Sequence, residues 1–127
     1  MKWDFKNGIP IYLQIISILK MQIAGGGLPP GSQIQPVRDL AMEAGVNPNT
    51  MQRALTQLEQ EGLLYTQRTS GRFVTEDEEV LREMRKSLSE QYVRELFESL
   101  SKIGMDKNEI IEAVRSYQEE PAVKKEG

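Results

Sequence analysis

The sequence predicts a mainly α-helical chain that contains one small β-hairpin. Apolar residues recur at three- and four-residue steps along most of it, the period of a helix with one buried face. The exception is residues 63–75, where two short β-prone runs flank a turn that contains Gly71. A further apolar stripe, 81–103, would form a helix of roughly 40 Å, longer than a small domain needs.

Composition excludes most kinds of catalytic site. The chain has 127 residues, 39% hydrophobic and 28% charged, so we expect a folded, soluble protein. It contains no cysteine and no histidine. Disulfides, thiolate nucleophiles, imidazole bases and the common zinc sites are therefore excluded, and we expect no cofactor, no metal and no enzymatic activity.

The sequence gives no sign of a membrane segment. Its most apolar region, 9–23, is interrupted by Pro10, Gln14 and Lys20, and is too short and too polar to span a bilayer. The first residues lack the charged-then-apolar order of a signal peptide. We therefore expect a cytoplasmic protein with no membrane contact.

Charge is distributed unevenly along the chain, whose formal net charge is −3. Residues 1–75 hold seven basic and five acidic side chains, a net of +2, whereas residues 76–127 carry a net of −5. If the chain binds an anionic polymer, we therefore expect residues 1–75 to do so. A net charge of +2 gives only a weak electrostatic attraction, so we expect two copies to act together.

The first elements are a helix, an extended segment and a second helix. The helix 9–24 ends at Gly25–Gly27. A glycine triplet is also found in phosphate-binding loops, but the Lys-Ser/Thr pair of those loops is missing here. Residues 32–35 are expected to be extended, and a short helix, 36–44, follows and ends at Gly45.

The stretch 44–55 predicts a turn between two helices, and we interpret the second helix as a DNA-recognition helix. Asn47 is a good N-cap and Pro48 fits the first helical position. One set of side chains at helical spacing points inward: Met51, Leu55 and Leu58. The polar side chains near the helix start then face outward, where amide, hydroxyl and guanidinium groups can read base edges in a major groove.

After this helix, which ends near Glu61, the hairpin leads to two more helices. Thr75 and Glu78 form the pattern of a capping box for a long helix that runs to about Ile103. Asp106 and Glu109 form the same pattern for a last helix. The apolar positions of both helices predict a dimer interface formed by Leu81, Met84, Leu88, Tyr92, Leu96, Leu100, Ile110 and Val114. The alternative is that the long stripe folds back onto the first part of the chain.

These elements predict three regions. Residues 1–75 are expected to form a DNA-binding domain, 76–120 a helical dimerisation segment, and 121–127 a flexible polar tail.

The order of helix, helix, recognition helix and hairpin is that of a winged helix-turn-helix, and residues 10–74 resemble the GntR family of bacterial regulators. The matching stretches are Pro10–Ile15, Pro30–Ser32, Val37–Ala41, Asn49–Leu55 with Leu58–Leu63, and Gly71–Val74. The short helical remainder resembles the YtrA subfamily, in which this part serves dimerisation.

The resemblance implies roles for individual positions. It implies that Arg38 contacts DNA from the helix before the recognition helix, that Asn49, Thr50 and Gln52 contact bases and backbone, and that Gly71 lies at the wing tip. The full expected DNA-contacting set is Arg38, Asn49, Thr50, Gln52, Arg53, Arg68, Thr69, Gly71 and Arg72. Two departures from the family pattern, Ile34–Pro36 and Pro48, leave the base preference open.

We therefore expect a homodimeric repressor that binds an inverted-repeat operator in double-stranded DNA. The resemblance suggests that this operator belongs to a transporter-type operon. Its small-molecule effector, if any, is unassigned. The competing interpretation is a winged domain that binds proteins, with its arginines as ordinary surface charges. For Arg53, pairing with an acidic neighbour is a further alternative.

Overall fold

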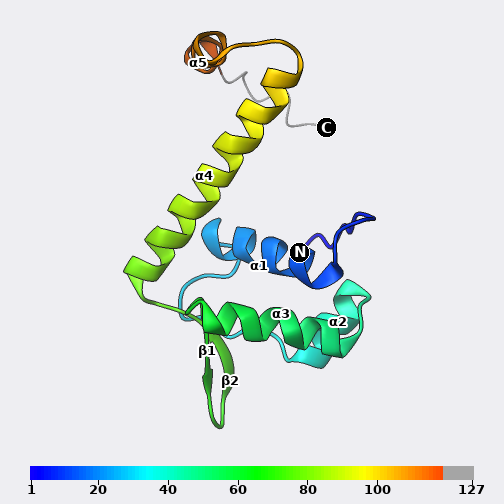
Figure 1. Cartoon of the computed structure of the whole chain (residues 1–127). Coiled ribbons are helices and arrows are strands. Elements are labelled where there is room, and N and C mark those ends of the chain that lie inside the picture. Colours follow the sequence, from blue (N-terminus) through cyan, green and yellow to red (C-terminus); the bar gives the residue numbers. More distant parts are fainter. Residues whose placement is uncertain (119–127) are drawn as a thin grey trace. The chain divides into compact units, whose positions relative to one another are not determined.

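The computed structural model describes residues 1–118, in two compact units. The first unit, Met1–Lys86, contains α1 (Ile11–Ala24), α2 (Val37–Ala44), α3 (Pro48–Gln60), β1 (Leu64–Gln67), β2 (Gly71–Val74) and the beginning of α4 (Glu78–Lys102). The second unit starts at Ser87 and contains the rest of α4 and α5 (Lys107–Ser116). The mainly helical class with a β-hairpin is confirmed (Figure 1). The expected tail 121–127 lies outside the described residues.

The core of the first unit is built around α3, which packs against both α1 and α2 (Figure 1). The side chains of Met51, Leu55 and Leu58 are fully buried, as the helical spacing predicts. Ile15 of α1 and Leu40 of α2 are buried with them. Since each buried aliphatic side chain stabilises the fold by roughly 1.5–3 kcal/mol, this one face determines how α3 is rotated.

The turn before α3 has the predicted geometry. Gly45 ends α2 in the left-handed conformation, with φ of 72°, which strains any residue that carries a Cβ. The Asn47 side chain accepts a hydrogen bond from the backbone N–H of Asn49 at 2.7 Å, and Pro48 begins the helix. These residues set where α3 starts, and so which of its side chains face the core.

The hairpin pairs β1 with β2 in antiparallel register, from Leu64 opposite Val74 to Gln67 opposite Gly71. Both strands fall within the stretch 63–75 that the sequence predicts for the hairpin. The extended segment before α2 adds to the free edge of β2, since the N–H of Ile34 donates to the carbonyl of Arg72 at 3.0 Å. The sequence predicted that this segment is extended; its pairing with the hairpin is a finding of the structure.

One predicted cap is wrong and another is confirmed. The α4 helix is capped by Asp77, whose carboxylate accepts from the backbone N–H of Glu79 at 3.0 Å. Thr75 instead accepts from the N–H of Asp77 in the turn before the helix, so Thr75 and Glu78 form no capping box. The Asp106–Glu109 capping box of α5 is present in both directions.

Within residues 1–118, none of the helices combines the length and the apolar character needed to cross a membrane.

The Asn47 cap gives a test of what starts α3. Asn47→Ala leaves the N–H of Asn49 without its side-chain acceptor, and we expect the free energy of unfolding to fall by about 1 kcal/mol. Urea denaturation measures this loss. Asn47→Asp retains a capping oxygen and serves as the control; an equal loss in both variants would contradict the capping role.

Glu61, the residue after α3, is bound to α1 by an ion pair with Lys20 at 2.8 Å. Partial burial acts to raise the pKa of Glu61, but hydrogen bonds from Gln57 and Lys20 and the charge of Lys20 outweigh it, and the pKa lies below its ordinary value of 4.5. The carboxylate form is thus favoured in the folded chain.

This lowered pKa predicts the sign of a pH effect. The contribution of Glu61 to stability is fully present above its unfolded pKa and is lost as the pH falls through the lower folded value. We expect Glu61→Gln to reduce the decline in thermal stability between about pH 6 and pH 3. Glu112→Gln, in a solvent-exposed pair with Arg115, is the matched control and should leave that decline unchanged.

Candidate nucleic-acid interface

The outward face of α3 carries the polar side chains expected to read DNA. Asn49 and Gln52 are exposed near the helix start, and Thr50 is half-buried between them and the core. The Gln52 amide donates to the hydroxyl of Thr56 at 3.0 Å, one turn further along. Because the opposite face is fully buried, these groups cannot turn inward without unfolding the helix.

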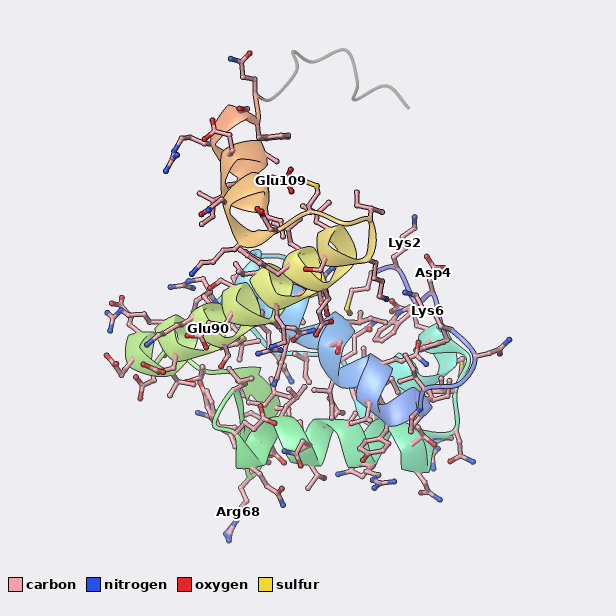
Figure 2. The ribbon with its side chains drawn as sticks, turned by 45° about the horizontal axis from the view of Figure 1, so that its top comes forward. Lys2, Asp4, Lys6, Arg68, Glu90 and Glu109 are labelled. Carbon is pink, nitrogen blue, oxygen red and sulfur yellow. The ribbon has the colours of Figure 1, made fainter. Side chains whose placement is uncertain are left out.

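Two exposed arginines, one in α2 and one in the hairpin turn, have no ion-pair partner among residues 1–118. Arg38 is exposed in the first turn of α2, and Arg68 is exposed in the turn between β1 and β2. Figure 2 shows the Arg68 side chain extending away from the ribbon, on a different side of the unit from Lys2 and Lys6. Thr69 is exposed beside Arg68. Exposed guanidinium groups are suited to phosphate contacts.

Gly71 ends the wing turn with φ of 112°, as its predicted role in the turn requires. A Cβ built at this position would lie 2.8 Å from the side-chain nitrogen of Gln33. That amide donates to the carbonyl of Ser70 at 2.5 Å. A residue with a side chain at this position would therefore be strained and would also displace a hydrogen bond that holds the wing.

Arg53 has a partner that the sequence did not indicate. Its guanidinium carbon lies 3.6 Å from the centroid of the Tyr12 ring of α1, a cation–π contact. The alternative of an acidic partner is not what the structure shows. Arg53 remains exposed at the surface, with its orientation set by the ring beneath it.

Arg72 does not extend from the wing as Arg68 does. Its guanidinium lies 3.3 Å from a carboxylate oxygen of Glu59 in the last turn of α3, and only 18% of its side chain is exposed. Arg68 and Arg72 both belong to the expected DNA-contacting set. The structure separates them, because the side chain of Arg72 folds back toward α3.

Three of the five acidic side chains in residues 1–75 have a partner within the chain. Glu43 accepts from the indole N–H of Trp3 at 2.9 Å, Glu59 pairs with Arg72, and Glu61 pairs with Lys20. Pairing limits the repulsion that these carboxylates exert on a polyanion. At the surface formed by α2, α3 and the wing, three arginines have no acidic partner among residues 1–118: Arg38, Arg53 and Arg68.

Sequence analysis missed Gln33, Glu59 and Tyr12 as parts of this surface. Gln33 had one available signal, its position in the extended segment 32–35. Glu59 and Tyr12 sit within ordinary helical patterns, and their contacts with Arg72 and Arg53 join different elements. Periodicity along the chain does not reveal contacts of this kind.

The predicted dimer-interface residues divide into two groups. Leu81, Met84 and Ile110 are 5%, 7% and 1% exposed in the single chain, so they belong to its interior and are not free for a partner. The dimer interface itself stays a prediction. Leu88 and Leu100 are half-buried, while Tyr92, Leu96 and Val114 are exposed. Further apolar side chains in α4 and α5 or directly after them are also exposed: Val93, Ile103 and Tyr117.

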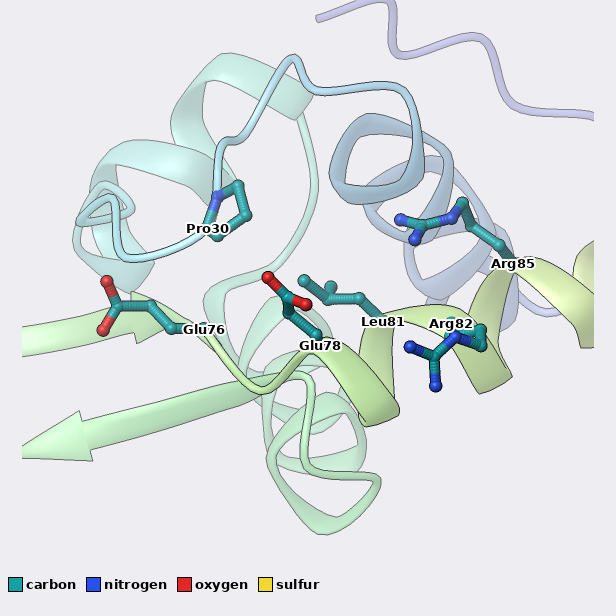
Figure 3. Close-up of a pocket in the computed structure, with 6 residues that line it drawn as sticks. All are labelled: Pro30, Glu76, Glu78, Leu81, Arg82 and Arg85. Carbon is teal, nitrogen blue, oxygen red and sulfur yellow. The ribbon is translucent and has the colours of Figure 1, made fainter.

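The first unit also contains a hollow of about 370 Å³ at the start of α4 (Figure 3). It is lined by Pro30, Glu76, Glu78, Leu81, Arg82 and Arg85. Two carboxylates balance two guanidinium groups there, and Arg82 pairs with Glu79, so the hollow favours neither an anion nor a cation. No group of acidic side chains in residues 1–118 has the arrangement of a metal site.

Residues 11–74 match the model of the bacterial regulatory proteins of the gntR family. Two curated relatives come from Bacillus subtilis (strain 168). The uncharacterized HTH-type transcriptional regulator YhcF is 30% identical over 116 residues, which covers 91% of this chain and 96% of YhcF. The HTH-type transcriptional repressor YtrA is 38% identical over 74 residues, covering 58% of this chain and 57% of YtrA.

Solved structures show the same likeness. A GntR family transcriptional regulator from Listeria monocytogenes superposes with a TM-score of 0.79 at 32% identity, covering 90% of this chain and all of that chain. The DNA-binding domain of AraR, in complex with operator ORX1, superposes with a TM-score of 0.54 at 26% identity. The match covers 59% of this chain and 96% of the AraR chain in that structure. Both contain the winged helix-turn-helix arrangement that α1–α3 and the hairpin form here.

Fold, family model and relatives agree that this is a transcriptional regulator with a DNA-binding domain, and the chain belongs to the GntR family of bacterial regulatory proteins, with YtrA among its relatives.

Proposed function

We propose that the chain is a homodimeric, sequence-specific repressor that binds an inverted-repeat operator. The observation that carries this proposal is the capped start of α3, at which Asn49 and Gln52 are exposed. Arg38 and Arg68 add two exposed cations without an ion-pair partner among residues 1–118. Side-chain amides are suited to bidentate contacts with adenine, and guanidinium groups to phosphates or guanine. Phosphate contacts would set the register and α3 would discriminate bases.

The relatives support this use of the fold. The AraR domain was solved on its operator, and YtrA is named a repressor. By analogy, α3 enters a major groove and the wing, with Arg68 and Thr69 at its tip, lies against the neighbouring backbone. Binding at a promoter would repress by excluding RNA polymerase. The resemblance to YtrA suggests a transporter-type operon as the target, and we place the protein in the cytoplasm with no enzymatic role.

In this proposal, residues that follow the first unit, from Ser87 onward, form the dimer interface. Tyr92, Val93 and Leu96 are 45%, 53% and 39% exposed on consecutive turns of α4, and Val114 and Tyr117 are exposed at the end of α5. Large apolar side chains exposed together mark a surface that another protein covers. A second copy of the chain would supply the second recognition helix and double a modest positive field.

Operator binding is tested with a duplex selected by the full chain from randomised DNA and titrated in a gel shift against its scrambled sequence. We expect Arg38→Ala to weaken binding to the selected duplex by roughly tenfold or more, because a positioned arginine contact contributes about 1–3 kcal/mol. Arg115→Ala removes an exposed arginine of the second unit and is the matched control.

Equal affinity of the wild-type chain for the selected and scrambled duplexes, at moderate salt, would falsify specific binding. If Arg38→Ala changes nothing while the chain stays folded and dimeric, the arginine is an ordinary surface charge. A protein-binding winged domain would then be the better interpretation.

The dimer is tested by sedimentation of a variant with Val93→Gln and Leu96→Gln. Both side chains are exposed, so the helix should persist while the apolar contact is lost, and we expect a shift from dimer to monomer. Met42→Gln, at an 80% exposed apolar position of the first unit, is the control and should remain dimeric. A variant that stays dimeric would show that this face of α4 is not the interface.

A further inference from the structure

One carboxylate joins the recognition helix to both strands of the wing. Glu59 lies in the last turn of α3. One of its carboxylate oxygens accepts from the guanidinium of Arg72 at 3.3 Å, and the other accepts from the hydroxyl of Thr66. Thr66 belongs to β1 and Arg72 to β2. The three side chains form a clasp that connects α3 to the hairpin, which we call the Glu59 clasp.

The hairpin register places the two donors of this clasp together. Thr66 and Arg72 are directly opposite each other in the β1–β2 pair, so their side chains leave the same face of the sheet. The side chains of Arg72 and Glu59 are 18% and 25% exposed. Partial removal from water strengthens a charged pair relative to a fully exposed one, so this pair should have a larger effect than an ordinary surface ion pair.

The Nε atom of Arg72 is buried and has no hydrogen-bond partner in the described part of the chain. A buried donor without a partner costs free energy, and the ion pair with Glu59 offsets that cost and keeps the side chain at this position. Swinging Arg72 out toward DNA would leave Glu59 as an uncompensated, largely buried carboxylate close to phosphates. Both the burial and the charge of Glu59 oppose that movement.

The opposite edge of β2 is also fixed. Val74 donates its N–H to the carbonyl of Ser32 at 2.9 Å, and the side chain of Gln33 donates to the carbonyl of Ser70 at 2.5 Å. A two-stranded hairpin is marginally stable by itself. The direction of this wing therefore depends on the segment 32–34 at one edge and on the Glu59 clasp at the end of α3.

We propose that Glu59 and Arg72 are positioning residues for DNA binding. Their pair sets the angle between the wing and α3, so that Arg68 at the wing tip reaches a phosphate while α3 lies in the major groove. Arg72 then acts through Glu59 and does not contact DNA. The part of this inference that concerns DNA binding rests on the proposed function. The Glu59 clasp itself can be tested without DNA.

The DNA arm compares three full-length variants on the selected duplex over a series of salt concentrations. Arg68→Met should reduce the slope of log affinity against log salt by about 0.9, the effect of one lost phosphate contact. Arg72→Met and Glu59→Gln should each weaken binding by roughly tenfold with the slope unchanged, because both break one charged hydrogen bond inside the protein. The double variant should be no weaker than either single one.

The second arm needs no DNA. Amide hydrogen exchange along β1 and β2 should become faster in Arg72→Met and Glu59→Gln, and should be unchanged in Arg68→Met. Arg72→Lys retains a cation that can reach Glu59 and should restore part of the protection. If the wild-type chain shows no preference for the selected duplex, the proposed function fails while this arm still tests the clasp.

Two outcomes would overturn the inference. A fall in the salt slope of about 0.9 for Arg72→Met would identify Arg72 as a phosphate contact. Unchanged hairpin exchange in both Glu59→Gln and Arg72→Met would show that the clasp does not hold the wing. Tighter binding by Glu59→Gln would likewise contradict it, because Glu59 would then be a competitor for Arg72.

Discussion

The structure depends on the complete burial of one face of α3. Met51, Ala54, Leu55 and Leu58 are removed from water along a helix of thirteen residues, so the helix has a single favourable rotation. Everything exposed on the opposite face follows from that rotation. The exposed polar side chains of α3 are therefore held in place by apolar packing behind them. The Asn47 cap determines at which residue the pattern of buried and exposed positions begins.

The elements that could be predicted are those set by neighbours along the chain. Gly45, Asn47 and Pro48 act within one turn of each other, and the spacing of Met51, Leu55 and Leu58 is a local pattern; these predictions are confirmed. The family relationship followed from five local stretches spread over residues 10–74. The site assignments of Arg38, Asn49 and Gln52 remain predictions, now with exposed side chains in a suitable arrangement.

What could not be predicted joins elements that are distant in sequence. Glu59 and Arg72 are thirteen positions apart, and Arg53 and Tyr12 lie on different helices. An arginine on a predicted wing looks the same in sequence whether it extends to solvent or folds back on a carboxylate. In the same way, a helical apolar period shows that Leu81 and Met84 are buried, but not whether the chain itself or a partner covers them.

The two parts of α4 have different neighbours, and this has a genetic consequence. Leu81 and Met84 are interior residues of the first unit, whereas Tyr92 and Leu96 of the same helix face solvent in the single chain. Under the proposed assembly, a substitution at Leu81 or Met84 that unfolds the subunit removes it from the dimer. In a cell that carries a second, intact copy of the gene, the intact copy then compensates. A substitution of Arg38 leaves a subunit that still folds and dimerises. Such an allele would be dominant, because each heterodimer would contain one subunit that binds DNA poorly.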